Sequence, residues 1–196
     1  DGSFSYYTRF VTGGQHPLFC RLPRDGGDEQ ILIDGNALAK DHAYFRISNV
    51  AHSPDHRLIA YAVDTKGSEF STVHVVEATT SAVIDSHIAD NNGNFEWASD
   101  SRTLLYVWLD DEHRPRKVLS HAIGADGQDA LVHEQPDPAY FLGLSETQSR
   151  RYLLLNASDH ETAEIRLVDT KDLSAAPRLV SAREPEHDYS VEHHDD

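Results

Sequence analysis

The sequence repeats itself at an interval of about 45 residues, and this period restricts the possible folds more than any other feature. The segment Ser53–Tyr61 returns as Ala98–Tyr106, with its Asp, Arg and Tyr each 45 positions further along. A weaker third copy, Gln148–Leu154, follows after a further 48 positions and keeps the Arg. A fixed period of this length is typical of folds built from stacked units of a few strands or helices each.

The units are predicted to consist of strands. Apolar residues occur in runs of four to eight, separated by Asp, Gly, Asn, Ser and Pro, which is typical of strands and turns. Helical periodicity is almost absent, and the one short helix candidate is Asn36–Lys40, with Asp34 placed to cap it. Four strands in each unit of about 45 residues indicate β-propeller blades. We therefore predict an all-β chain, a partial β-propeller of about four blades of four-stranded antiparallel sheets.

The strand pattern also predicts where each blade begins and ends. Ala82–Ser86 and Asn94–Ala98 are expected as separate strands that close one blade and open the next, and Tyr189–Glu192 is expected as a strand. Acidic loops join the second strand to the third, so they should lie on one face; they are 64–69, 110–116 and 158–161. The predicted blades are 4–34, which lacks one strand, 45–88, 94–133 and 140–182, while 189–196 starts another.

Composition excludes several classes of partner. The chain has 196 residues, with 17 Lys+Arg against 33 Asp+Glu and a net charge of −16, so no basic stripe is available for nucleic acid. The longest apolar stretch, Leu58–Val63, is far too short to cross a membrane. One cysteine, Cys20, cannot form an internal disulfide, which predicts a reducing, cytoplasmic location. The chain has no methionine, and we expect it to be an internal or trimmed fragment.

No residue pattern indicates a catalytic centre. Asp55 and Asp100, each followed by an Arg, can accept hydrogen bonds from downstream amides in tight turns and are interpreted as structural. Ser145 lies in a Gly-Leu-Ser-Glu-Thr sequence that lacks the second glycine of a nucleophile elbow. Cys20 is interpreted as a buried apolar residue. Phosphate loops and dinucleotide fingerprints are absent. We expect no catalytic residue and no cofactor, and we identify no substrate-binding residue.

Metal binding is not predicted either, although the chain has 13 histidines. His193 and His194 are adjacent and would point to opposite faces of a strand, and His187 lies six positions before His193. The loop 158–161 offers a single histidine, and the loop 110–113 lacks the glycine and the ligand order of a calcium loop. These acidic loops are interpreted as solvated turns.

Several segments, in the same order along nearly the whole chain, resemble the oligopeptidase B branch of the prolyl oligopeptidase family of serine peptidases. A Ser-Pro-Asp turn alone is common in propellers, but the ordered combination is specific. The similar segments are Leu32–Ala39, Tyr44–Phe45, Ser53–Tyr61, Asp64–Thr65, Trp97–Tyr106, Leu109–Pro115, Pro136–Pro138, Asp159–Thr162 and Tyr189–His194.

The resemblance implies a seven-bladed propeller that caps an α/β-hydrolase domain, which would use a Ser-His-Asp triad to cleave short peptides after Lys or Arg. That catalytic domain is absent from this sequence, so the resemblance implies an inactive fragment and gives no triad or specificity residue a position here. Its implied partners are the catalytic domain of the same chain and short basic peptides, which the propeller would select by size. The acidic chain would attract such peptides. Open blade flanks predict that the fragment self-associates.

Two other classes of function remain open. A stand-alone propeller of the WD or kelch type would be a protein-binding scaffold without catalysis. A secreted, sugar-active propeller would require paired carboxylates at one site, and no such pair stands out in the sequence. The sequence downstream of residue 196 distinguishes these classes, because further blades and a G-x-S-x-G domain would follow only in the peptidase.

Overall fold

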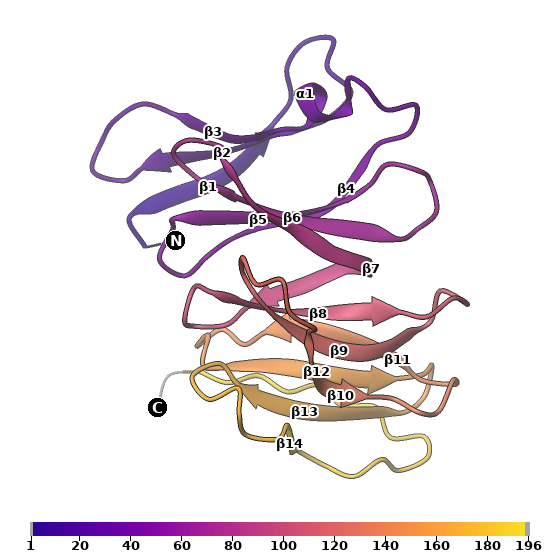
Figure 1. The fold of residues 1–196 in the computed structure, drawn as a ribbon. Coiled ribbons are helices and arrows are strands. Elements are labelled where there is room, and N and C mark those ends of the chain that lie inside the picture. The colour runs from indigo at the N-terminus through magenta and orange to yellow at the C-terminus, as the bar shows by residue number, and fades with distance from the viewer. Residues whose placement is uncertain (1, 195–196) are drawn as a thin grey trace.

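The computed structural model describes residues 2–194 and shows an all-β chain whose sheets stack face to face from one end to the other (Figure 1). The strands form three sheets, and within each sheet every strand pairs antiparallel with its neighbour in sequence. The predicted fold class, a partial β-propeller, is confirmed. The elements are β1 (Phe4–Arg9), β2 (Leu18–Pro23), β3 (Gln30–Asp34), α1 (Gly35–Ala39), β4 (Arg46–His52), β5 (Leu58–Asp64), β6 (Ser71–Glu77), β7 (Val83–Trp97), β8 (Thr103–Leu109), β9 (Pro115–Ala122), β10 (Ala130–Glu134), β11 (Phe141–Glu146), β12 (Tyr152–Ser158), β13 (Ala163–Asp169) and β14 (Arg178–Leu179).

The middle sheet has seven strands, in the order β10-β9-β8-β7-β6-β5-β4, and joins two blades through one strand. The first part of β7, residues 83–91, pairs with β6, and its last part, residues 91–97, pairs with β8. The two strands predicted here are therefore one continuous strand. We call β1–β3 the first blade, β4–β6 with residues 83–91 the second, residues 91–97 with β8–β10 the third, and β11–β14 the fourth. The blade limits predicted from the sequence remain a proposal.

A buried asparagine and a glycine let β7 pass between blades without a loop. Asn91 is fully buried; its side-chain amide donates to the carbonyls of Ser71 and Ile88, and its Oδ1 accepts from the Gly93 amide. Gly93 has φ +84°, and a Cβ there would lie 2.4 Å from the Ser48 Cβ on β4. A larger residue is therefore excluded both by conformation and by the close approach of β4.

The repeated turns occupy equivalent positions, as the sequence predicts. In the first two copies, the Asp55 and Asp100 side chains accept the amides of Arg57 and Arg102, and each turn links the first and second strands of its blade. The third turn is closed from Thr147 to Tyr152, and Ser149 Oγ accepts the amide of Arg151. The third copy therefore follows at 49 positions, not 48, because Ser149 takes the place of the Asp.

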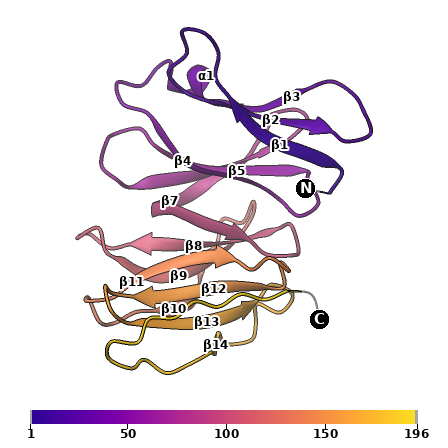
Figure 2. The same cartoon turned by 180° about the vertical axis from the view of Figure 1, so that it is seen from behind.

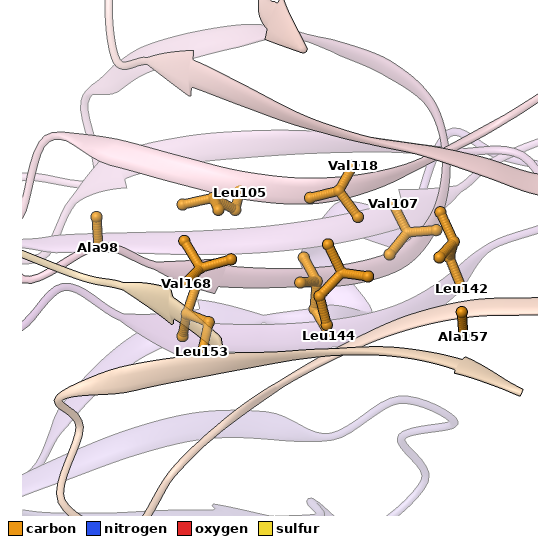
Figure 3. Packing of buried hydrophobic residues seen from close by; sticks show 10 residues of the cluster. Ala98, Leu105, Val107, Val118, Leu142, Leu144, Leu153, Ala157 and Val168 are labelled. Atoms are coloured by element: carbon orange, nitrogen blue, oxygen red, sulfur yellow. The ribbon is translucent and has the colours of Figure 1, made fainter. Parts of the chain in front are cut away.

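Apolar side chains on both faces of the central strands hold the blades together. On β5, Ile59, Tyr61 and Val63 pack toward the first blade, whereas Ala60 and Ala62 pack toward the third. On β8, Leu105 and Val107 pack against leucines of the fourth blade (Figure 3). These are Leu142 and Leu144 of β11 and Leu153 and Leu155 of β12. Three apolar clusters thus lie between successive blades, and the strands that separate them are buried on both faces.

Two further features complete the fold. The short helix α1 is capped by Asp34, whose Oδ1 accepts hydrogen bonds from the amides of Asn36 and Ala37. No helix in residues 2–194 is long and apolar enough to cross a membrane.

The predicted strand Tyr189–Glu192 is not a strand in the structure. That segment crosses the fourth blade (Figure 2) and makes single hydrogen bonds rather than a ladder; for example, the Ile165 amide donates to Tyr189 Oη. Residues 195–196 of the predicted next blade lie outside the described residues.

Replacing Asn91 by Ala should destabilise the chain by about 2–4 kcal/mol, because it leaves buried backbone groups at the β7 crossover without partners. The measurement is urea unfolding, in which the midpoint should fall while its slope stays constant. The control is Asn92→Ala at the exposed neighbouring position. It loses only an exposed hydrogen bond from the Asn94 amide and should cost about 1 kcal/mol or less. Equal losses for the two variants would show that Asn91 does not hold the crossover.

Candidate functional site

The structure places the candidate nucleophiles apart from any catalytic neighbours. Cys20 is buried in β2 at 1% exposure. Ser145 is exposed on β11, where its paired residue is Leu154. Within residues 2–194 no hydrogen bond joins either side chain to a histidine, the base that would activate it. Neither residue is therefore part of the candidate site.

Two of the histidines and the acidic loops singled out in the sequence make structural contacts. His187 Nδ1 lies 3.9 Å from Glu184 Oε2, and its ring packs against Tyr189. His193 Nδ1 lies 2.7 Å from Ser149 Oγ, and its ring packs edge-on against Tyr152. The Asp110 and Asp159 carboxylates accept amides of their own loops. Among the described residues there is no group of three or more His, Cys, Asp or Glu side chains that could hold a metal ion.

The three acidic loops lie along one face, as predicted. Phe70, just after the loop 64–69, packs 4.3 Å from the ring of His113 in the next loop. Arg114 then lies over the ring of Phe141, whose backbone pairs with Ser158 at the start of the third loop. The Asp64 carboxylate is buried and accepts three amides of its own loop, which orders the backbone there.

The candidate site lies where the first strands of three blades end. Hydrogen bonds join these strands: the Trp97 indole to the Ala51 carbonyl at 3.2 Å, and Asn94 to both backbone groups of Leu144, at 2.9 and 2.7 Å. At their ends, a cavity of about 240 Å³ is lined by polar side chains from all three blades, on the side of the repeated turns. They are His52, Glu96, Glu146 and Arg150. The first strands of blades line the central channel of a propeller, so this cavity belongs to the channel wall.

The electrostatics of this cavity are unusual for two glutamates. Burial raises the pKa of Glu96 to about 7, and the nearby Glu146 carboxylate adds to the shift. Burial also raises the pKa of Glu146, against the opposing effect of Arg150, whose Nε lies 3.5 Å away. Burial lowers the pKa of His52, so this ring does not offset the carboxylates with a charge at neutral pH. A cation entering the cavity would favour the ionised form of both glutamates.

A second polar cluster lies between the outer strands of the second and third blades. His121 of β9 is buried, and its two ring nitrogens face Asp85 of β7 and Asp129 of the loop before β10. This cluster forms one side of a cleft of about 660 Å³. The sequence contains no signal for either cluster. Apart from the pairs Glu146 and Arg150 and His121 and Asp129, the members of each cluster are 36 to 98 positions apart. Only the packing of blades brings them together.

The fold and this channel wall define a β-propeller, and comparison with known proteins gives its family. All 196 residues match the family described as "Prolyl oligopeptidase, N-terminal beta-propeller domain". The chain belongs to the prolyl oligopeptidase family, as the propeller region of its members.

Individual relatives agree with this assignment. The chain is 30% identical to dipeptidyl aminopeptidase BI of Pseudoxanthomonas mexicana, over 96% of this chain and 28% of that protein. It is 27% identical to Protease 2 of Moraxella lacunata, over 100% of this chain and 30% of that one. The structure of oligopeptidase B from Leishmania major superposes with a TM-score of 0.92 at 27% identity, over 99% of this chain and 28% of the other. The chain thus spans less than a third of the length of these relatives.

Replacing Glu96 by Gln should remove a pH-dependent loss of stability. Since the pKa of Glu96 rises from 4.5 to about 7 on folding, the wild-type chain loses stability as pH rises between these values, and the loss is complete above them. Relative to wild type, the free energy of unfolding of the Gln variant should be higher at pH 8 than at pH 4.5, by about 1–2 kcal/mol. Urea unfolding at both pH values measures this, with Glu134→Gln at an exposed position of β10 as the matched control. An equal difference at both pH values would contradict the assignment.

Proposed function

We propose that this chain is the substrate-gating propeller portion of a serine oligopeptidase that hydrolyses short peptides after Lys or Arg, and that the 196-residue chain alone is not catalytic. The whole-length match to the propeller of the prolyl oligopeptidase family supports the first part. Related proteins carry peptidase names, among them oligopeptidase B of Trypanosoma brucei with covalently bound antipain, at 30% identity and a TM-score of 0.89. The catalytic serine, base and oxyanion hole would come from an α/β-hydrolase domain of the same longer chain.

The observation that carries the basic-peptide specificity is the acidic channel wall. Glu96 and Glu146 face one cavity on three adjoining first strands, in a chain with a net charge of −16. Arg150 brings one positive charge to the same cavity, so two ionised carboxylates leave a negative excess. A low-dielectric channel with an excess of one sign of charge concentrates the field and raises the local concentration of oppositely charged substrate. Lys- and Arg-containing peptides would therefore gather at this wall, while the ring of blades would exclude folded proteins by size. We further propose that the protein acts in the cytoplasm, consistent with its single buried cysteine.

The full-length gene product should release product from lysyl and arginyl amide substrates, whereas the isolated chain should release none above blank, because it offers no activated nucleophile. The same full-length protein should cleave a short unstructured peptide after Lys or Arg. It should leave intact a folded protein that contains the sequence of that peptide. Chromogenic amides and mass spectrometry of the peptide products measure both effects.

Two results would overturn this proposal. Turnover by the isolated chain that survives re-purification and is blocked by a serine-directed inhibitor would show that it holds its own catalytic centre. A full-length product without peptidase activity would favour the stand-alone scaffold. Peptidase activity without a preference for Lys or Arg would leave the family assignment unchanged and would refute only the proposed role of the acidic channel.

We also propose that the isolated chain self-associates through the free face of its first blade. Tyr6 and Phe19 pack toward the second blade, so the alternate residues of this sheet face away from it. Three of them, Tyr7, Leu22 and Ile31, are 37–47% exposed. Burying apolar area gains roughly 25 cal/mol per Å², and repulsion between the acidic copies is screened within about 8–10 Å at ordinary salt.

Light scattering after size-exclusion chromatography should therefore report a dimer or larger species at micromolar to millimolar concentration. Ile31→Lys should shift the chain toward monomer, because it places a charge in the proposed contact. The control is Val83→Lys, on the exposed outer strand of the second blade, which should leave the assembly unchanged. A wild-type monomer at high concentration would contradict the proposal.

A further inference from the structure

The seam between the second and third blades is built differently on its inner and outer sides. On the inner side, Val73, Val75 and Phe95 are fully buried in a continuous apolar cluster. On the outer side, the first part of β7 and the strands β8–β10 enclose the 660 Å³ cleft, and Leu131, which lines it, is 56% exposed. Apolar packing therefore does not close the outer side, and the contact there is polar.

His121 lies at the centre of that polar contact. Its Nε2 is 2.8 Å from Asp85 Oδ2, on the second blade, and its Nδ1 is 2.7 Å from Asp129 Oδ1, on the third. The His121 side chain is 3% exposed and that of Asp85 is fully buried. Tyr106 donates its hydroxyl hydrogen to Asp129 at 2.6 Å, and the Gly124 amide donates to Asp85 at 2.6 Å. Asp85 Oδ1 also accepts a hydrogen bond from the His87 amide at 3.0 Å and lies 3.1 Å from Nδ1 of the exposed His87 ring. Apart from the two histidine rings, these partners of the two carboxylates are all donors.

We propose that Asp85, His121 and Asp129 form a proton-operated clamp, in which the protonated His121 ring ties the outer strand of the second blade to the third blade and loss of its proton releases the outer seam. A neutral imidazole carries only one N–H, so one ring nitrogen would turn a lone pair toward a carboxylate oxygen less than 3 Å away. The imidazolium alone satisfies both contacts, because both of its nitrogens donate.

The charges around the ring fix the direction of the pH dependence. Burial lowers the pKa of His121, but hydrogen bonds to Asp85 and Asp129 outweigh it, and the net pKa lies above the ordinary value of 6.5. Stabilisation by the protonated ring is therefore complete below 6.5 and lost as pH rises through the raised pKa. The other titratable groups that face the ring or the cleft beside it are His87 and Asp90 of β7, Tyr106 of β8, Lys117 of β9 and Asp126 of the following loop.

The acid side sets the other limit of the clamp. Burial raises the pKa of Asp85, but the hydrogen bonds from the Gly124 amide and His121 lower it by a larger amount, so the net pKa is about 2. The stabilisation by the ionised Asp85 carboxylate is complete above about pH 4 and is lost as pH falls toward 2. The clamp should thus be closed across mildly acidic to neutral pH and open at alkaline pH. Tyr106 is the member of the inner apolar cluster that contacts the clamp, and its hydroxyl bond to Asp129 does not involve His121. The apolar packing of the inner cluster does not depend on the His121 proton, so we expect release to widen the outer cleft without unfolding the blades.

Trp108 lines the cleft and reports on it, whereas the only other tryptophan, Trp97, is 5% exposed in the inner cluster. Acrylamide quenching of tryptophan fluorescence in the full chain should therefore rise between pH 6 and 9, at least about twofold, with a midpoint above 6.5. A neutral quencher avoids charge effects. Trp108→Phe should remove the transition, which assigns the signal, and circular dichroism should stay constant through it.

Two variants test the clamp itself. His121→Gln should abolish the transition, and the matched control His74→Gln, a partly buried histidine stacked on Tyr61, should keep it. Asp129→Asn removes one carboxylate from the ring and should move the midpoint to lower pH, which remains measurable if the Gln variant does not fold. A flat wild-type profile, a transition that persists in a folded His121→Gln chain, or a midpoint unmoved by Asp129→Asn would overturn the proposal. None of these measurements depends on peptidase activity.

Discussion

Face-to-face packing of blades is the interaction on which the rest of this structure depends. The strands β5 and β8 each contribute side chains to two apolar clusters, so they are buried on both faces and cannot be stable in a single isolated sheet. Stability therefore arises between neighbouring blades, as in other repeat folds. The same dependence leaves one face of the first blade uncovered in the described chain and concentrates polar contacts at the seams, where small changes in charge have large effects.

The polar side chains have two distinct tasks within that apolar framework. Some replace missing backbone partners: Asn91 holds the crossover in β7, and Asn94 joins the first strands of the third and fourth blades. Others place titratable groups in less exposed positions: Glu96 is partly buried in the channel wall, and His121 is buried in the outer seam. Buried polar groups of the first kind fix geometry, whereas those of the second kind make the geometry respond to pH or to a cation.

The channel wall and the outer seam therefore link the fold to the proposed function in different ways. Glu96 and Glu146 lie where a peptide entering a propeller would pass, and their raised pKa values make them ready to ionise beside a cation. The clamp at His121 lies away from that path and concerns the stiffness of the ring. A gating propeller needs both properties, a wall that attracts its substrate and blades that stay together while it passes.

The sequence by itself determined the all-β class, the period of the blades and the structural role of the Asp55 and Asp100 turns, because these depend on local turn chemistry and short-range apolar patterns. The tertiary structure decided the rest. Residues 83–97 form one strand because Asn91 and Gly93 meet β4 and β6, which local propensity does not register. Glu96 meets Glu146, and Asp85 meets His121, across blade seams that bring together residues 50 and 36 positions apart. Long-range packing alone creates those neighbours, and with them the shifted pKa values on which the proposed chemistry rests.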